Sequence, residues 1–329
     1  MIDDHIPIVE LDDELDTYLE HESGSSRSAD TIQSIGDSLA RWGFVSIVQH
    51  GVKRALLDQA YDYARKVFAL TTSQKLKYED KVGGRQRGYT PFLMERAKGQ
   101  VSGDLKEFWH IGRELEVTHP YLSSGMMRTN LFPHEVPGFQ HVMLNLYEEL
   151  DRLAHRMLRV IEHYLQIPSG QLSRLAYEGN SVLRVVNYPD LKEIERVPGS
   201  VRAAAHEDIN LLTLLPAATQ PGLQLLTREG EWIDVNSPPG SIILDTGDMM
   251  NAVTGGRMPS TTHRVVNPDE ESAGGRLSMP FFMHPRPDAV LEVLVGSKDV
   301  QSIEGIGMTA QAYLDRRLSE NGLMTPPQT

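Results

Sequence analysis

The residues of this chain whose types and spacing could do chemistry are His206, Asp208 and, further along, His263. Side chains two positions apart in a β-strand point to the same face, so a strand here would bring His206 and Asp208 together and turn Glu207 away. A histidine from a neighbouring strand would then complete a set of two imidazoles and one carboxylate. Such a set binds non-haem Fe(II) and leaves coordination positions open for other ligands.

A His-x-acid pair alone has little weight, because 12 His and 45 Asp and Glu in 329 residues would produce about 1.6 such pairs by chance. A second motif, Arg276-Leu277-Ser278, adds to it. On one face of a strand, the Arg276 guanidinium can bind a carboxylate in two places, and the Ser278 hydroxyl can add a third contact. The order of these motifs predicts a metal site beside a carboxylate receptor.

Taken in order, His206-x-Asp208, His263 and Arg276-x-Ser278 resemble the motifs of the isopenicillin N synthase-like family of Fe(II)/2-oxoglutarate-dependent dioxygenases. Further segments share this resemblance, at residues 6–9, 42–45, 50–52, 104–108, 222–225 and 259–265. The similarity extends over residues 5 to 300, and its motifs follow the order of the family.

The resemblance implies that His206, Asp208 and His263 are the catalytic residues and bind Fe(II) as its metal ligands. It also implies 2-oxoglutarate as co-substrate, held at its distal carboxylate by Arg276 and Ser278, and O2 as oxidant. The implied reaction oxidises a substrate C–H bond, by default through hydroxylation, and decarboxylates 2-oxoglutarate to succinate and CO2. Desaturation or ring closure would need only a different placement of the substrate.

Tyr188 aligns with a family tyrosine that also touches the co-substrate. Plant members of the family have Asn-Tyr-Tyr before the proline, where this chain has Val186-Asn187-Tyr188 before Pro189. The contact made by their first asparagine is therefore absent here or displaced onto Asn187.

The substrate is expected to be a small molecule. Residues 81–87 are basic and Gly-rich, which predicts a mobile lid over the site. The side chains expected to contact the substrate are Arg85, Tyr89, Trp109, His110 and Phe282. Arginines at positions 85, 87, 96 and 257 indicate an anionic or carboxylate-bearing substrate.

The residues alone leave other functions open. One is a same-family Fe(II) oxidase that does not use 2-oxoglutarate, since isopenicillin N synthase and aminocyclopropanecarboxylate oxidase use Arg-x-Ser for a different acid. Another is a non-catalytic jelly-roll binding protein, against which the intact triad argues. The most distant is a zinc hydrolase with a His-His-carboxylate site, which would have no use for Arg276 and Ser278.

Composition restricts the partners and the compartment. The formal net charge of −13 argues against a nucleic-acid partner, which would require a basic face. The chain has no Cys, so it has no disulfide framework or thiolate metal site, which suits a reducing compartment. The acidic N-terminus lacks a signal-peptide pattern, and no apolar run reaches the ~20 residues of a membrane span. We therefore expect a cytoplasmic enzyme, a monomer or weak homo-oligomer, with no membrane partner.

The predicted elements change type near residue 181. Apolar residues at three-to-four spacing predict helices at 30–42, 54–70, 138–165, 168–177 and 308–321. Strands are predicted at 6–10, 44–48, 106–111, 182–188, 201–206, 209–215, 222–227, 231–235, 241–245, 261–267 and 276–283.

This pattern predicts a β-rich α+β fold with a jelly-roll, or double-stranded β-helix, core braced by N-terminal helices and a long central helix. Within one integrated domain, we expect a helical and strand region at 1–120, bracing helices at 121–180, the catalytic core at 181–290, and a C-terminal helix and tail at 291–329.

Overall fold

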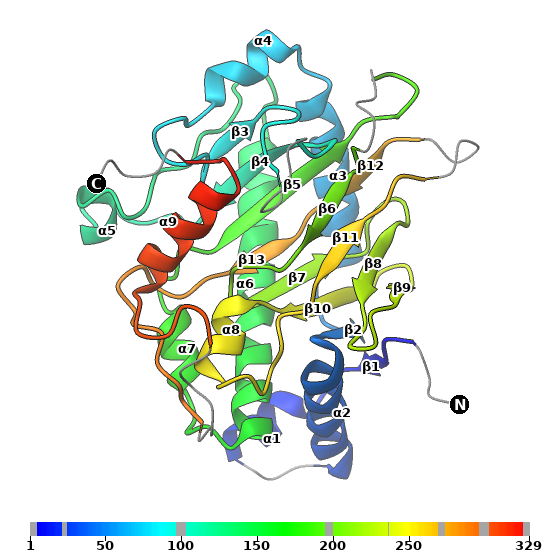
Figure 1. Cartoon of the computed structure of the whole chain (residues 1–329), viewed down its shortest axis with the longest axis vertical. Coiled ribbons are helices and arrows are strands. Elements are labelled where there is room, and N and C mark those ends of the chain that lie inside the picture. The colour runs from blue at the N-terminus through cyan, green and yellow to red at the C-terminus, as the bar shows by residue number, and fades with distance from the viewer. Residues whose placement is uncertain are drawn as a thin grey trace.

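Two β-sheets that face each other form the core of the chain (Figure 1). The structure, a computed structural model, describes residues 5–21, 25–96, 103–194, 200–235, 237–268, 274–295 and 303–324. The larger sheet has the order β1 (Ile8–Glu10), β2 (Phe44–Val48), β10 (Ile242–Thr246), β7 (Leu212–Pro216), β13 (Phe281–Met283), β5 (Val182–Tyr188), β4 (Glu107–Gly112), β3 (Gly88–Thr90), with β12 (Arg276–Ser278) also paired to β5. The smaller sheet has the order β6 (Ala203–His206), β11 (His263–Val265), β8 (Leu223–Leu226), β9 (Trp232–Asp234). This arrangement confirms the predicted jelly-roll core.

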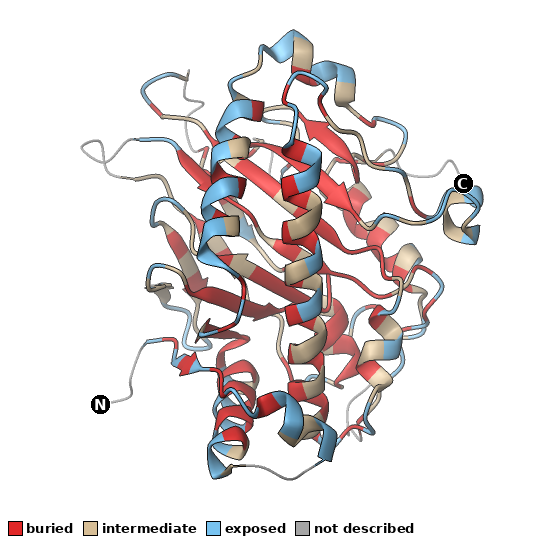
Figure 2. Ribbon diagram, turned by 180° about the vertical axis from the view of Figure 1, so that it is seen from behind, coloured by how far each residue is buried: buried red, intermediate tan, exposed pale blue. Residues whose placement is uncertain are grey.

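Helices cover the outer face of the larger sheet, as Figure 2 shows from behind. The helices are α1 (Leu15–His21), α2 (Ser26–Trp42), α3 (Arg54–Phe68), α4 (Thr72–Lys75), the 3-10 turn η1 (Leu76–Tyr78), α5 (Pro120–Ser123), α6 (Phe139–Leu165), α7 (Gln171–Ala176), α8 (Asp248–Val253) and α9 (Ala310–Glu320). The long α6 packs against α2, α3 and several strands, because its apolar residues form one continuous stripe. No described helix is both long and apolar enough to cross a membrane.

The larger sheet is buried on both faces. Because its side chains alternate, every second residue of a strand points into the interior of the jelly roll. In β5, Leu183 and Val185 pack toward the helices, whereas Arg184, Val186 and Tyr188 line the space between the two sheets. Because successive strand residues point to opposite faces, each neighbour of an interior residue is directed to the helical layer.

The predicted helix and strand positions are mostly confirmed, and the errors lie at the ends. The helix predicted at 30–42 begins at Ser26, because the Ser25 hydroxyl accepts a hydrogen bond from the Ser28 amide at 3.3 Å. The helix predicted at 168–177 begins only at Gln171, since Gly170 has a positive φ of 82°. Sequence patterns did not reveal α1, α4, α5, α8 or β3, which are all short.

The strand predicted at 276–283 is two strands, β12 and β13, separated by Met279 and Pro280. Proline lacks the amide donor of a sheet ladder, which explains the break. Its carbonyl instead accepts the Arg184 amide at 2.8 Å. Within the C-terminal region predicted at 291–329, residues 296–302 and 325–329 lie outside the described residues.

Candidate metal centre

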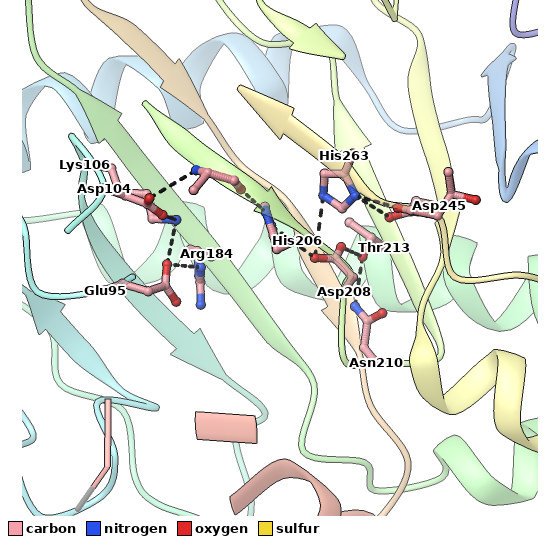
Figure 3. Close-up of polar contacts among 12 residues, drawn as sticks. Glu95, Asp104, Lys106, Arg184, His206, Asp208, Asn210, Thr213, Asp245 and His263 are labelled. Carbon is pink, nitrogen blue, oxygen red and sulfur yellow. Dashed lines mark hydrogen bonds and ion pairs between the residues drawn. The ribbon is translucent and has the colours of Figure 1, made fainter. Parts of the chain in front are cut away.

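His206, Asp208 and His263 form a cluster between the two sheets (Figure 3). His206 is the last residue of β6 and His263 the first of β11, and the two are directly opposite in the antiparallel pair. Oδ1 of Asp208 lies 3.8 Å from Nε2 of each histidine. One ligand atom from each residue lies within 4.8 Å of the others, which is close enough for all three to bind one ion.

Asp208 reaches the cluster from a loop, although the sequence predicted it on the same strand face as His206. Strand β6 ends at His206, and the chain then turns. The Asp208 carbonyl accepts the Asp248 amide at 2.7 Å, which ties this loop to the start of α8. Glu207 is not one of the clustered ligands, and it accepts a hydrogen bond from the Thr262 hydroxyl.

Backbone carbonyls fix the tautomer of both histidines. Nδ1 of His206 lies 2.7 Å from the Ala204 carbonyl, and Nδ1 of His263 lies 3.1 Å from the Thr261 carbonyl. A carbonyl can only accept, so each Nδ1 carries a proton, and in the neutral form of each ring the lone pair is on Nε2. Both lone pairs are therefore free to bind a metal at the side where Asp208 lies.

A short chain of hydrogen bonds orients the carboxylate (Figure 3). The Thr213 hydroxyl donates to Oδ2 of Asp208. Having given its only proton, Thr213 accepts from the Asn210 amide at 2.9 Å. Oδ1 of Asp208 thus remains directed toward the two histidines. No sequence pattern singled out Thr213, an ordinary strand residue whose contact depends on how β7 packs against the loop.

Burial and the charges within the cluster shift the pKa values of His206 and Asp208 toward the forms that bind a metal, a neutral imidazole and a carboxylate. Burial and the neighbouring His263 lower the pKa of His206 to about 4. Burial raises the pKa of Asp208, but His263, His206 and the Thr213 hydroxyl outweigh it, and the net pKa is below the usual value. At neutral pH the cluster therefore offers a neutral His206 imidazole and the Asp208 carboxylate, next to the His263 ring. This nitrogen and oxygen donor set without sulfur fits Fe(II).

Asp245 of β10 is a buried carboxyl beside the cluster that the sequence analysis did not single out. Its Oδ2 lies 3.9 Å from Nδ1 of His263. Burial and the charge of Asp208 raise its pKa well above the usual range. An acid at the end of the apolar run Ile242–Leu244 was the available signal, because such a residue has to face a polar interior.

A first cavity, of about 620 Å³, connects the cluster to the predicted carboxylate receptor. Arg276, Ser278 and Tyr188 all line it. The Arg276 side chain donates from Nε to the Gln220 carbonyl at 3.0 Å, and its guanidinium carbon lies 5.1 Å from the centre of the Tyr188 ring. Its Nη1 is buried without a partner among the described residues. A buried cationic donor without an acceptor fits a bound carboxylate.

Asn187 does not line this cavity, contrary to the prediction that it contributes to co-substrate binding. Its amide donates to Glu107 at 2.9 Å on the helical side of the sheet. Tyr188 and Val186 occupy the interior face of β5, so alternation turns Asn187 away from the site.

A second cavity lies on another side of the cluster. It is lined by Gln86, Glu95, His110, Val182, Arg184, His206, Glu207, Asp208, Ile209, Asn210, Phe282, His284, Leu314, Leu318 and Asn321. The predicted contacts His110 and Phe282 belong to this cavity. Arg184 also lines the first cavity, so the two spaces meet beside the cluster.

Three other predicted substrate contacts are placed elsewhere. Trp109 and Tyr89 are buried in the helical layer of the core, where the Tyr89 hydroxyl donates to Glu107 at 2.5 Å. Trp109 is the strand neighbour of His110, so only one of them can face the interior. Arg85 is paired with Glu79 at 2.9 Å and donates to the Leu323 carbonyl.

The segment predicted as a basic lid therefore contributes a neutral residue, Gln86, to the second cavity. Arg87 is fully buried and donates to the Arg128 and Gln86 carbonyls and to Asn180. With Arg85 and Arg87 both engaged away from the site, they no longer support a carboxylate-bearing substrate.

A buried group of four charges adjoins both cavities, and the sequence analysis did not identify it as a group (Figure 3). Lys106 contacts Glu95 at 2.6 Å and Asp104 at 2.8 Å, and Arg184 contacts Glu95 at 3.0 Å. Asp104 also accepts the Ala204 amide at 3.1 Å. Since the Ala204 carbonyl holds Nδ1 of His206, this group braces the edge strand that carries the first histidine.

Comparisons with known proteins agree with this site. Residues 6–135 match the N-terminal region described for a non-haem dioxygenase in morphine synthesis, and residues 177–285 match the 2OG-Fe(II) oxygenase superfamily. The chain is 31% identical over 260 residues to gibberellin 2-beta-dioxygenase 3 of Arabidopsis thaliana, with 78% of this chain and 73% of the relative covered. It is 29% identical over 272 residues to the 2-oxoglutarate-Fe(II) type oxidoreductase hxnY of Emericella nidulans, with 81% and 77% covered.

Solved structures are also similar to this chain. A 2OG-Fe(II) oxygenase family protein from Caulobacter crescentus is 35% identical, with a TM-score of 0.79 and coverage of 96% of this chain and 98% of that chain. A full-length Neurospora crassa protein, solved in complex with alpha-KG and thymine, is 22% identical with a TM-score of 0.80 and coverage of 97% and 98%. At that identity the second likeness concerns the fold alone.

The Thr213 hydroxyl is expected to matter for metal binding. Replacing it in Thr213→Val keeps the shape but removes the donor that orients Asp208, and loss of such an outer contact typically weakens metal affinity about 10–100-fold. Titration of the metal-free protein with Fe(II) under nitrogen measures this. Thr227→Val is the matched control, because among the described residues the Thr227 hydroxyl bonds to the Glu231 amide of its own turn. Equal affinity in Thr213→Val and wild type would contradict the orienting role.

Glu95 is expected to stabilise the fold in a pH-dependent way. Burial raises its pKa, but Arg184 and Lys106 outweigh burial, and the net pKa is lowered from 4.5. A lowered carboxyl pKa gives stability that is present above the unfolded value and lost as pH falls toward the folded value. Glu95→Gln should therefore reduce the free energy of unfolding by about 3–5 kcal/mol at neutral pH. Urea unfolding measures this: the free energy of unfolding of Glu95→Gln should approach that of wild type below about pH 4.5. A difference in unfolding free energy that stays constant down to acid pH would refute the role of Glu95.

Proposed function

Because this chain belongs to the 2OG-Fe(II) oxygenase superfamily, we propose that His206, Asp208 and His263 bind its iron, and that Arg276 and Ser278 bind its 2-oxoglutarate. The substrate is a small molecule that occupies the second cavity, and the reaction oxidises one of its C–H bonds, by default to an alcohol. The observation that carries this proposal is the first cavity, which has the three metal-ligand candidates and a buried, unpartnered Arg276 donor in its wall.

Iron with 2-oxoglutarate and O2 supplies the oxidising power, and succinate and CO2 are the co-products. The side chains of the protein bind and orient the iron, the 2-oxoglutarate and the substrate. Arg276 and Ser278 hold the distal carboxylate of 2-oxoglutarate, and the Tyr188 ring packs beside the guanidinium. Apolar residues Leu223, Ile243 and Val265 line the space around this carboxylate and keep water out. Exclusion of water strengthens the charge-assisted contact at Arg276.

The two histidines and Asp208 would hold the ion, and the same side chains border the cavities proposed for 2-oxoglutarate and the substrate. Thr213 and Asp104 act through other groups and are positioning residues. Thr213 holds the carboxylate, and Asp104 holds the strand backbone at Ala204. Burial and the charge of Asp208 raise the pKa of the nearby Asp245 well above its usual range, which favours the uncharged form of this carboxyl beside the cluster.

Arg276→Ala should raise the KM for 2-oxoglutarate greatly, because a buried carboxylate would lose its charge-assisted partner at a cost of roughly 2–5 kcal/mol. Arg276→Lys keeps the charge but loses the two-pronged geometry, so an intermediate KM is expected. Succinate formation at varied 2-oxoglutarate concentration measures both. Arg264→Ala is the matched control, since that arginine packs over Trp232 outside both cavities.

An unchanged KM in Arg276→Ala would contradict the assignment of this residue. If substrate were oxidised at full rate with no 2-oxoglutarate present, the same-family oxidase that uses a different acid would replace the proposed reaction.

A further inference from the structure

We propose that the second cavity selects a neutral, hydrogen-bonding small molecule over a carboxylate, and that Glu95 sets this preference by neutralising Arg184. This inference rests on the proposed function, because it takes the second cavity as the substrate site. It reverses the expectation from the sequence that the substrate bears a carboxylate.

The charged side chains in the cavity wall are the first evidence for a neutral ligand. Arg184 is the one Arg or Lys among the described residues that line the cavity, and Glu95 and Glu207 are the acids there besides the metal-ligand candidate Asp208. Arg184 is paired with Glu95 at 3.0 Å, with side-chain exposures of 16% and 8%. A carboxylate placed against this guanidinium would therefore lie beside Glu95 and share the cavity with Glu207. Like charges at such short range destabilise a complex.

Further contacts hold Arg184 in the position where it pairs with Glu95. Its guanidinium carbon lies 4.3 Å from the centre of the Phe108 ring and 5.1 Å from that of Phe282. Its Nε donates to Nε2 of His110 at 2.7 Å. These contacts leave Nη2 as the guanidinium nitrogen with no hydrogen bond to a described residue, and it can donate to one neutral acceptor such as a carbonyl oxygen.

The two hydrogen bonds of the His110 ring require it to be neutral. Its Nδ1 lies 2.8 Å from the Arg85 carbonyl, which can only accept, and its Nε2 faces Nε of Arg184, which can only donate. One nitrogen must therefore carry a proton and the other a lone pair. His110 adds no positive charge that could attract an acid.

The remaining polar groups of the wall are neutral donors and acceptors. They are Gln86, Asn210, Asn321 and His284, and the apolar side chains beside them include Phe282, Leu314 and Leu318. Nδ1 of His284 is buried with no partner among the described residues. Such a wall suits a molecule that both donates and accepts hydrogen bonds, as an amide or a lactam does.

The contrast with Arg276 supports the same conclusion. Both arginines line the first cavity, but Arg276 has no acidic partner among the described residues and keeps a buried donor unused. A buried arginine without an acid receives an anion, whereas one already paired presents a nearly neutral surface. The chain thus separates an anion site at Arg276 from a neutral site at Arg184.

Matched amide and carboxylate pairs test the proposal, benzamide with benzoate and nicotinamide with nicotinate among them. Binding is measured by ligand-observed NMR on the full chain loaded with Zn(II) and saturating 2-oxoglutarate, which prevents turnover and fills the Arg276 site. Wild type should bind the amides at least tenfold more tightly than the acids. Glu95→Gln leaves the Arg184 charge exposed and should shift the preference tenfold or more toward the acids.

Glu79→Gln is the matched control, because it breaks a buried pair with Arg85 outside the cavity and should keep the preference of wild type. Tighter binding of the acids by wild type, or binding of neither member of any pair, would overturn the proposal. So would an unchanged preference in folded Glu95→Gln, with folding checked by its unfolding transition. The signals of 2-oxoglutarate in the same samples report separately on the proposed co-substrate, so failure of the two ideas can be told apart.

Discussion

The antiparallel register of β6 and β11 is the constraint on which the site depends, because it places His206 directly opposite His263. A shift of β6 by one residue would turn His206 out of the interior, while β11 would stay in register with β8 on its other side. Strand β6 is at the edge of its sheet, so β11 holds only one side of it. On its other side, the Asp104 carboxylate binds the Ala204 amide, and the Leu105 amide binds the Val201 carbonyl. The N-terminal half of the chain thus fixes a strand of the catalytic core.

The same alternation divides the larger sheet into a chemical face and a packing face. Interior positions carry Arg184, Tyr188 and Asp245, and the positions between them pack on α3 and α6. The polar interior stays stable because its charges are matched. The four charges of Glu95, Asp104, Lys106 and Arg184 sum to zero, and isolated charges in such a space would be costly. Arg276 differs, because none of the described residues offers it an acidic partner, and this agrees with its proposed role as the receptor for an anion.

Much of this arrangement could be predicted from the sequence. Period-two spacing brought His206 and Asp208 together, and it succeeded although Asp208 lies past the end of the strand. The face that each strand turns inward could not be predicted, because it depends on pairing with distant strands. Trp109 and His110 were both expected in the pocket wall, and Tyr188 and Asn187 both at the co-substrate, yet neighbours in a strand point apart. Contacts such as Thr213 to Asp208 arise from packing alone.

The most direct test of the central claim is an anaerobic titration of the metal-free protein, first with Fe(II) and then with 2-oxoglutarate, monitored in the visible spectrum. If iron and 2-oxoglutarate bind together at this cluster, a metal-to-ligand charge-transfer band should appear in wild type and be absent in His206→Ala. Iron binding without a band would contradict 2-oxoglutarate as co-substrate. A band of full strength in His206→Ala would contradict the assignment of the metal centre to His206, Asp208 and His263.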